Sequence, residues 1–227
     1  MIPDKHSLFS TRVILTFFLS AYGLSLIAQT VTDESAPQYL FSEFSRGIIK
    51  MKNGSSQIAI MNYNTLTEKM EFKQNDNMMY LTNLDGIDTV SLQNAKFIPV
   101  EKVFYEVLVD APVSLFVQHV SELKSIGRPG AYGITSQTAG PTSVSKMYID
   151  KKSYNLKIPD DTKVTPSPVN WIRINGIMHK FLTERQFLKI FPGKEDIIRK
   201  TITQNNLNIK NQNDLINLVN YCNKLIK

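Results

Sequence analysis

Hydrophobic and polar positions alternate with a period of two over much of residues 39–120. Such runs, rich in β-branched and aromatic residues and separated by clusters of Asn, Asp, Gly and Pro, predict short strands joined by turns. The Asn53-Gly54 pair is a strong hairpin signal. Closely spaced short strands predict an antiparallel sandwich or an open barrel. The predicted strands are 46–52, 55–63, 69–73, 78–82, 87–92, 96–100, 103–109 and 113–120.

The alternation stops after about residue 123. Residues 124–146 hold four Gly, two Pro and seven Ser or Thr, which predicts a long surface loop. Residues 159–169 contain three prolines and predict a linker or an extended crossing segment. Asn175-Gly176 then predicts a second hairpin, with strands at 170–174 and 177–182.

The remainder has the period of a helix. Thr183 and Gln186 fit a capping box that opens a short helix ending near Phe191. Two longer helices are expected over 194–206 and 214–226, each with an apolar side that predicts docking on the sheet or on a neighbouring helix. The apolar positions are Ile197, Ile198, Thr201 and Ile202 in the first, and Leu215, Leu218, Val219, Cys222, Leu225 and Ile226 in the second.

These patterns predict an α+β protein with two regions. Residues 39–158 form an antiparallel β domain that includes the loop at 124–146. Residues 159–227 form a linker, a hairpin and a basic helical region of about three helices.

The first 28 residues have the pattern of a secretory signal peptide. Lys5 and Arg12 precede an uncharged apolar run at 13–27, and Ala28 precedes a polar segment at 29–38 that is expected to be a loose leader. The run is shorter than the roughly 20 residues of a spanning helix, although an uncleaved anchor is the alternative. We expect cleavage after Ala28, no transmembrane segment in the mature chain, and a periplasmic, outer-envelope or secreted location.

Charge and cysteine content limit the disulfides and the kinds of partner that can be expected. The single cysteine, Cys222, allows no internal disulfide, and its place on an apolar helical stripe predicts a buried thiol. Residues 29–150 carry a net charge of −3, whereas residues 151–227 carry +8. A basic region suits anionic lipid, acidic glycan or simple solvation, and export argues against nucleic acid as a partner.

The sequence contains no motif for known catalytic or metal chemistry. His119 and His179 have no ligand-type neighbours at metal-binding spacing, and no nucleophile elbow, phosphate loop or zinc-protease motif occurs. No catalytic residue, metal ion or cofactor is therefore predicted.

Binding residues are predicted where aromatic and basic side chains fall in loops and hairpins. Arg128 and Tyr132 lie in the long loop, and Trp171, Arg173 and His179 lie on the second hairpin. An envelope protein or a glycan is the expected kind of partner.

Four segments carry a family resemblance. They are 26–29 (LIAQ), 61–72 (MNYNTLTEKMEF), 130–138 (GAYGITSQT) and 181–196 (FLTERQFLKIFPGKED). With these the chain resembles the uncharacterised exported proteins of Bacteroidota. The resemblance implies a periplasmic or surface-exposed protein and transfers no catalytic residue.

The leading functional hypothesis is a non-enzymatic binding or structural protein of the periplasm or cell envelope. One alternative is a secreted hydrolase whose site is assembled from distant residues. Another is a peripheral membrane protein that attaches through its basic helical tail.

Overall fold

The computed structural model describes residues 36–75, 77–125, 128–129, 135–136, 158 and 162–226. All of them belong to one compact unit, Asp33–Lys227. The predicted signal peptide and cleavage site lie outside the described residues, as does most of the predicted loop at 124–146.

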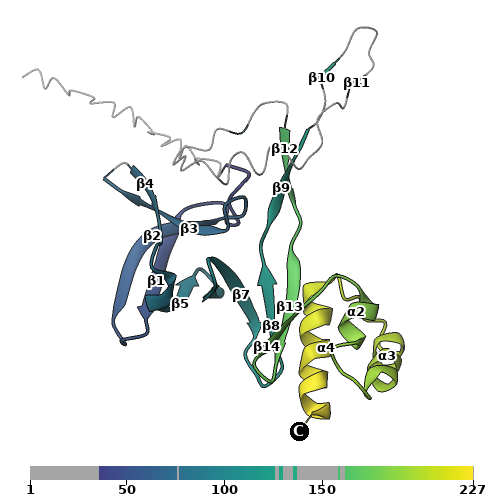
Figure 1. The fold of residues 1–227 in the computed structure, drawn as a ribbon. Helices are drawn as coiled ribbons and strands as arrows, with labels where there is room; N and C mark the ends of the chain where they lie inside the picture. Colours follow the sequence, from purple (N-terminus) through teal and green to yellow (C-terminus); the bar gives the residue numbers. More distant parts are fainter. Residues whose placement is uncertain are drawn as a thin grey trace, which may run out of the picture. The chain divides into compact units, whose positions relative to one another are not determined.

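A ten-stranded antiparallel sheet is the main feature of this unit (Figure 1). Its strand order is β14-β13-β8-β7-β6-β5-β1-β2-β3-β4, and it does not close on itself. The α+β class and the open antiparallel sheet are thus as the sequence predicts. The strands are β1 (Ser45–Met51), β2 (Ser56–Asn64), β3 (Lys69–Gln74), β4 (Asn77–Tyr80), β5 (Ile87–Leu92), β6 (Ala95–Val100), β7 (Val103–Val109), β8 (Ser114–Gln118), β13 (Val169–Ile174) and β14 (Ile177–Phe181).

Turn chemistry places these strands close to their predicted bounds. Gly54 and Gly176 have φ values of 87° and 78°, and Asn175 has 51°, as tight Asn-Gly hairpins require. A single 3-10 turn, η1 (Leu84–Gly86), separates β4 from β5. Predictions for the two hairpins are confirmed.

The second hairpin joins the same sheet as the first, because β13 pairs with β8 from Val169↔Gln118 to Arg173↔Ser114. Directly opposed residues of antiparallel strands project to the same face of a sheet. One face, here called the core face, carries Phe97, Leu115 and Ile172. The opposite side is the outer face.

Helices cover the core face of β7, β8, β13 and β14. They are α2 (Glu184–Leu188), α3 (Glu195–Gln204) and α4 (Gln212–Leu225) (Figure 1). The capping box of Thr183 and Gln186 is present, as predicted. The helices and these strands share one hydrophobic core, in which the buried residues of α3 and α4 are Ile198, Ile202, Leu215, Leu218, Val219 and Cys222.

The predicted stripe of α4 is confirmed from Leu215 to Cys222, but Ile226 lies beyond the end of the helix and is 44% exposed. Burial raises the pKa of the Cys222 thiol to about 12. The prediction for α3 is wrong at Ile197, whose surface is 45% exposed. The core needs only one narrow stripe from this helix, and Ile198 and Ile202, four residues apart, supply it.

A side-chain amide fixes α4 to the β7–β8 connection. Asn223 accepts a hydrogen bond from the Val113 N–H and donates one to the Val113 carbonyl, both at 2.9 Å. These bonds satisfy both backbone groups of Val113, whose side chain is completely buried.

A second hydrophobic core fills the core face of β1–β3 and β5–β7. Its large, fully buried members include Met61, Tyr63, Met70, Phe97 and Phe104. Tyr63 of β2 donates a hydrogen bond to the Phe104 carbonyl of β7 at 3.3 Å, although three strands separate β2 from β7 in the sheet order. The sheet therefore curls enough to bring these strands together.

The β2–β3 turn completes this approach at a three-way junction. Thr65 Oγ1 donates to the Gln38 carbonyl at 2.8 Å and is hydrogen-bonded to the Ser121 hydroxyl at 2.8 Å. The Ser121 N–H donates to the Thr65 carbonyl at 2.9 Å, and the Thr65 N–H donates to Gln38. Leu66 packs in a small core with Leu123 and Val164. Gln38, assigned to the loose leader, is instead buried and bonded.

Two stretches differ from the sequence predictions. The strand expected at 113–120 ends at Gln118, and a new strand, β9 (Ser121–Ser125), extends into the predicted loop. β9 pairs with β12 (Thr162–Pro166), which lies inside the predicted linker. Proline fits there because each strand has only one partner in this two-stranded ribbon. Two short strands, β10 (Arg128–Pro129) and β11 (Thr135–Ser136), also pair within the predicted loop.

Gly47 packs closely against the Met61 side chain in the second core. A Cβ at this position would lie 2.7 Å from Met61 Sδ and 2.8 Å from Met61 Cγ. We expect Gly47→Ala to lower the free energy of unfolding by about 1–3 kcal/mol, because the buried Met61 must move. Denaturant unfolding measures this. Gly86→Ala, whose nearest neighbour is the flexible Met51 Cε at 3.4 Å, is the control, and an equal loss in both variants would contradict the prediction.

Candidate functional site

Trp171 and Arg173, two of the residues predicted to bind, lie together on the outer face. Trp171 is opposite Phe116 on β8 and Lys180 on β14, while Arg173 is opposite Ser114 on β8. Alternation along β13 places both side chains on one side of the sheet. We call this surface the Trp171 face; it consists of Glu68, Gln118, Trp171, Arg173 and Lys180, with the buried Tyr105, Ser114 and Phe116 supporting them.

The indole of Trp171 is held in place from two directions. It stacks on the Tyr105 ring, with 5.5 Å between centroids and 27° between planes. Its Nε1–H donates to Gln118 Oε1 at 3.1 Å. Trp171 itself is only half-buried, so the fixed ring still presents part of its surface to solvent.

Gln118 links the indole to a carboxylate. Its Nε2 donates to Glu68 Oε2 at 2.5 Å while its Oε1 accepts from Trp171. An amide suits this position because it donates at one atom and accepts at the other. The contact connects the β2–β3 turn with β8 and β13.

Glu68 occupies an unusual place in that turn. Its φ of 57° is in the left-handed region, which non-glycine residues seldom adopt. Partial burial raises the pKa of its carboxyl group, and the hydrogen bond from Gln118 opposes that rise. Burial, and then the charge of Glu68, raise the pKa of the nearby Tyr63 and Tyr105 hydroxyls.

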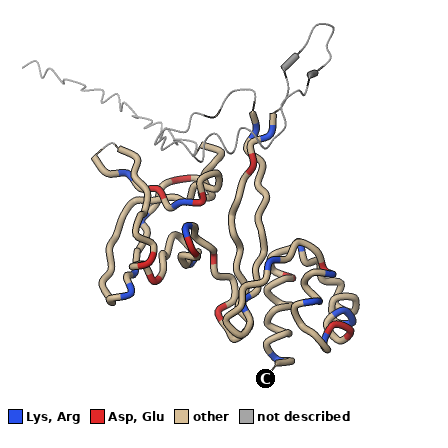
Figure 2. Tube along the Cα trace, in the orientation of Figure 1, with Lys and Arg blue, Asp and Glu red and all other residues tan. Residues whose placement is uncertain are grey.

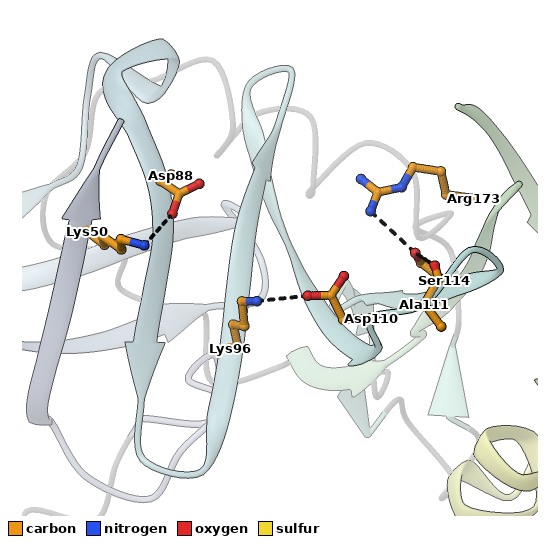
Figure 3. Close-up of polar contacts among 7 residues, drawn as sticks. All are labelled: Lys50, Asp88, Lys96, Asp110, Ala111, Ser114 and Arg173. Carbon is orange, nitrogen blue, oxygen red and sulfur yellow. Dashed lines mark hydrogen bonds and ion pairs between the residues drawn. The ribbon is translucent and has the colours of Figure 1, made fainter. Parts of the chain in front are cut away.

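At the other end of the Trp171 face, Arg173 has no acidic partner among the described residues. Its Nη2 donates to Ser114 Oγ at 3.3 Å, and Ser114 Oγ donates to the Ala111 carbonyl at 2.7 Å (Figure 3). The guanidinium also lies over the Phe116 ring, 4.9 Å from its centroid. The exposed Lys180 likewise pairs with no carboxylate in the described part of the chain.

This arrangement provides three kinds of contact on one surface. The indole offers a flat apolar patch, the half-buried Gln118 offers a neutral amide, and Arg173 and Lys180 offer positive charge. Ser114 is buried and holds Arg173 through a hydrogen bond. A planar guanidinium can form two parallel hydrogen bonds with one carboxylate. The Trp171 face is therefore suited to a flat ligand that carries negative charge.

The remaining predicted binding residues are not part of this face. His179 is opposite Ile172, which places it on the core face. Trp171 and His179 are eight positions apart, and across a two-residue turn an even separation puts two side chains on opposite faces of the sheet. Arg128 belongs to the short strand β10. Tyr132 lies outside the described residues.

His119, outside the Trp171 face, is paired with a carboxylate. Its Nε2 is 2.5 Å from Glu106 Oε2, and both side chains are 17% exposed. The imidazole lies against Tyr63 and Phe97, with centroid distances of 6.2 and 6.4 Å. His119 is thus paired with the Glu106 carboxylate, and no hydroxyl of the described residues is hydrogen-bonded to its ring.

A second carboxyl group in the turn region has a structural role. Glu71 accepts hydrogen bonds from Tyr39, Asn64 and Thr67, at 2.8, 2.9 and 3.4 Å. Burial raises its pKa, and these bonds oppose the rise. They tie the segment before β1 to β2 and β3.

Sequence reasoning missed Glu68, Tyr105 and Gln118. The only local signal was a polar or amphipathic residue inside an otherwise apolar strand, which applies to Tyr105 and Gln118. Glu68 gave no signal, because its role depends on a turn meeting β8 far along the chain.

Within the described residues, no helix combines the length and apolar character needed to cross a bilayer. The same residues contain no group of three or more His, Cys, Asp or Glu that could hold a metal ion.

Comparison with known proteins gave no match: no protein-family model, no curated protein and no solved structure is significantly similar to this chain. The Trp171 face is therefore interpreted from its own chemistry.

The raised pKa of Glu68 predicts a pH effect on stability. A group with a raised pKa binds its proton more tightly in the folded state, so the free energy of unfolding falls as pH rises above about 4 through the raised pKa. Glu68→Gln retains an acceptor for Gln118 and removes the buried charge. We expect this variant to lose that decline and to gain stability over wild type at pH 7, measured by urea unfolding from pH 3 to 8.

Glu43→Gln removes an exposed carboxyl group and controls for net charge. If Glu68→Gln and Glu43→Gln showed the same pH dependence as the wild type, Glu68 would not be the responsible group.

Proposed function

We propose that this protein is a non-enzymatic binding protein of the cell envelope that recognises an acidic glycan at the Trp171 face. Export through residues 1–28 is part of the proposal. Among the expected partners, a glycan with carboxylate or sulfate groups best fits the chemistry of this face.

The observation that carries the proposal is an unpaired guanidinium beside a fixed, partly exposed indole. The Tyr105 stack and the Gln118 hydrogen bond hold Trp171 before any ligand arrives. Preorganised aromatic side chains lose little entropy on binding and are common binding anchors. A sugar ring can lie on the indole while its acidic group reaches Arg173.

Charge explains the choice of an acidic rather than a neutral sugar. Arg173 and Lys180 carry no ion-pair partner in the described residues, whereas Lys96 pairs with Asp110 at 3.1 Å (Figure 3). Figure 2 marks Lys and Arg positions along the chain trace of the C-terminal part of the unit. An anionic ligand would supply the missing partner for Arg173.

Affinity electrophoresis and calorimetry with defined polysaccharides test this function. We expect retention by a uronate polymer such as polygalacturonate and much weaker retention by neutral laminarin. Arg173→Gln with Lys180→Gln should weaken binding by roughly tenfold or more, since hydrogen bonds to charged groups contribute about 1.5–3 kcal/mol each.

Lys194→Gln with Lys200→Gln removes the same charge from exposed positions around α3 and should leave binding within about twofold of wild type. Equal effects of the two double variants, or no preference for acidic over neutral polymers, would contradict the proposal. Retention of an acidic protein but of no polysaccharide would identify an envelope protein as the partner instead.

A further inference from the structure

Three isoleucines form an exposed apolar patch on the outer face of β1 and β2. Ile48, Ile58 and Ile60 are 47%, 55% and 48% exposed. Ile48 is directly opposite Ile58, and Ile60 is the next residue of β2 on the same face. Their neighbours along β1, Gly47 and Ile49, are buried on the core face.

This patch, called here the isoleucine patch, has a basic margin. Arg46 is opposite Ile60, and Lys50 follows Ile48 on the same face. Arg46 has no carboxylate partner among the described residues, while Lys50 pairs with Asp88 at 3.5 Å (Figure 3). Lys52 is exposed next to the turn of the hairpin. The margin thus carries three cations and one acid.

The basic C-terminal helices, which the sequence analysis gave as one alternative site of membrane attachment, offer no comparable patch. The apolar stripe of α4 is buried in the core. Two exposed isoleucines occur there, but Ile197 lies on α3 and Ile226 follows the end of α4. A peripheral membrane helix needs an exposed apolar face beside its cations. The apolar faces of these helices are buried against the sheet.

We propose that the isoleucine patch and its basic margin dock on the surface of an anionic lipid bilayer. The aliphatic side chains would enter the boundary between headgroups and acyl chains, and Arg46, Lys50 and Lys52 would lie at the level of the phosphates. A Lys or Arg near an anionic surface contributes about 1 kcal/mol. In the sheet order, β5 and β6 separate the patch on β1 and β2 from Tyr105 on β7, the nearest strand of the Trp171 face. The two proposals rest on different side chains, so this one is independent of glycan binding.

Two other occupants fit the patch less well. A second copy of the chain would place Arg46 and Lys50 close to the same two cations of the other copy, and repulsion between like charges disfavours such contact. Three half-exposed side chains also fall well short of the roughly 800 Å² per partner in a stable protein interface. A fluid lipid surface requires neither shape matching nor a large area.

Vesicle co-sedimentation of the compact unit Asp33–Lys227 tests the proposal. This unit contains every described strand and helix and omits the apolar run at 13–27, which could bind lipid by itself. We expect binding to phosphatidylcholine vesicles containing a quarter phosphatidylglycerol to be at least about tenfold stronger than to phosphatidylcholine alone, and to weaken at high salt.

The variant Ile48→Thr/Ile58→Thr/Ile60→Thr retains β-branched residues on exposed positions and should weaken binding about tenfold or more. The matched control Ile177→Thr/Leu182→Thr/Ile197→Thr removes three other exposed aliphatic side chains and should bind as wild type does. Near-ultraviolet circular dichroism verifies that both variants are folded.

Several results would overturn the proposal: no binding to either vesicle, equal binding to both, or wild-type binding by the patch variant. Loss of binding in Lys189→Gln/Lys194→Gln/Lys200→Gln but not in the patch variant would locate attachment in the basic helical region. Concentration-dependent dimerisation that the patch variant abolishes would show that a second copy is the occupant.

Discussion

The structure depends on the docking of the β2–β3 turn at the corner between β8 and β9. There Thr65 bonds simultaneously to Gln38 and Ser121, and Leu66 packs on Leu123. These contacts join segments that lie 27 and 56 residues away from Thr65. A long open sheet has no hydrogen bonds between its edges, so this junction, the Tyr63–Phe104 hydrogen bond and the second core together hold its curled part. Because the junction is buried, each unpaired group there would cost about 1–3 kcal/mol.

The candidate site depends on the same junction. The turn that docks through Thr65 ends at Glu68, which reaches Gln118, and Gln118 holds the indole of Trp171. At Glu68, the left-handed backbone conformation and the partly buried carboxylate each lower the stability of the fold locally. Such unfavourable conformations are kept only where the surrounding contacts hold them, and they often occur at binding surfaces. The fold and the Trp171 face are thus two results of one long-range contact.

Local features of the chain were predictable, and long-range ones were not. Period-two alternation and Asn-Gly pairs located the strands and hairpins, and Thr183 with Gln186 located a helix start, because these signals act within a few residues. The pairing of β13 with β8 depends on two strands about 50 residues apart, which no local pattern encodes. His179 was misplaced because the hairpin register decides its face. Trp171 and Arg173 could be predicted as an aromatic and a basic residue on a hairpin, whereas Glu68 and Gln118 required the tertiary contact.

The most direct test of this account is a double-mutant cycle between Thr65→Val and Ser121→Ala, with urea unfolding followed by the fluorescence of Trp171, the only tryptophan. The account predicts a coupling energy of about 0.5–1.5 kcal/mol between the two positions. It also predicts a change in native Trp171 emission in Thr65→Val, because the turn positions Glu68 and Gln118. Additive effects within about 0.3 kcal/mol, with native emission unchanged, would contradict it.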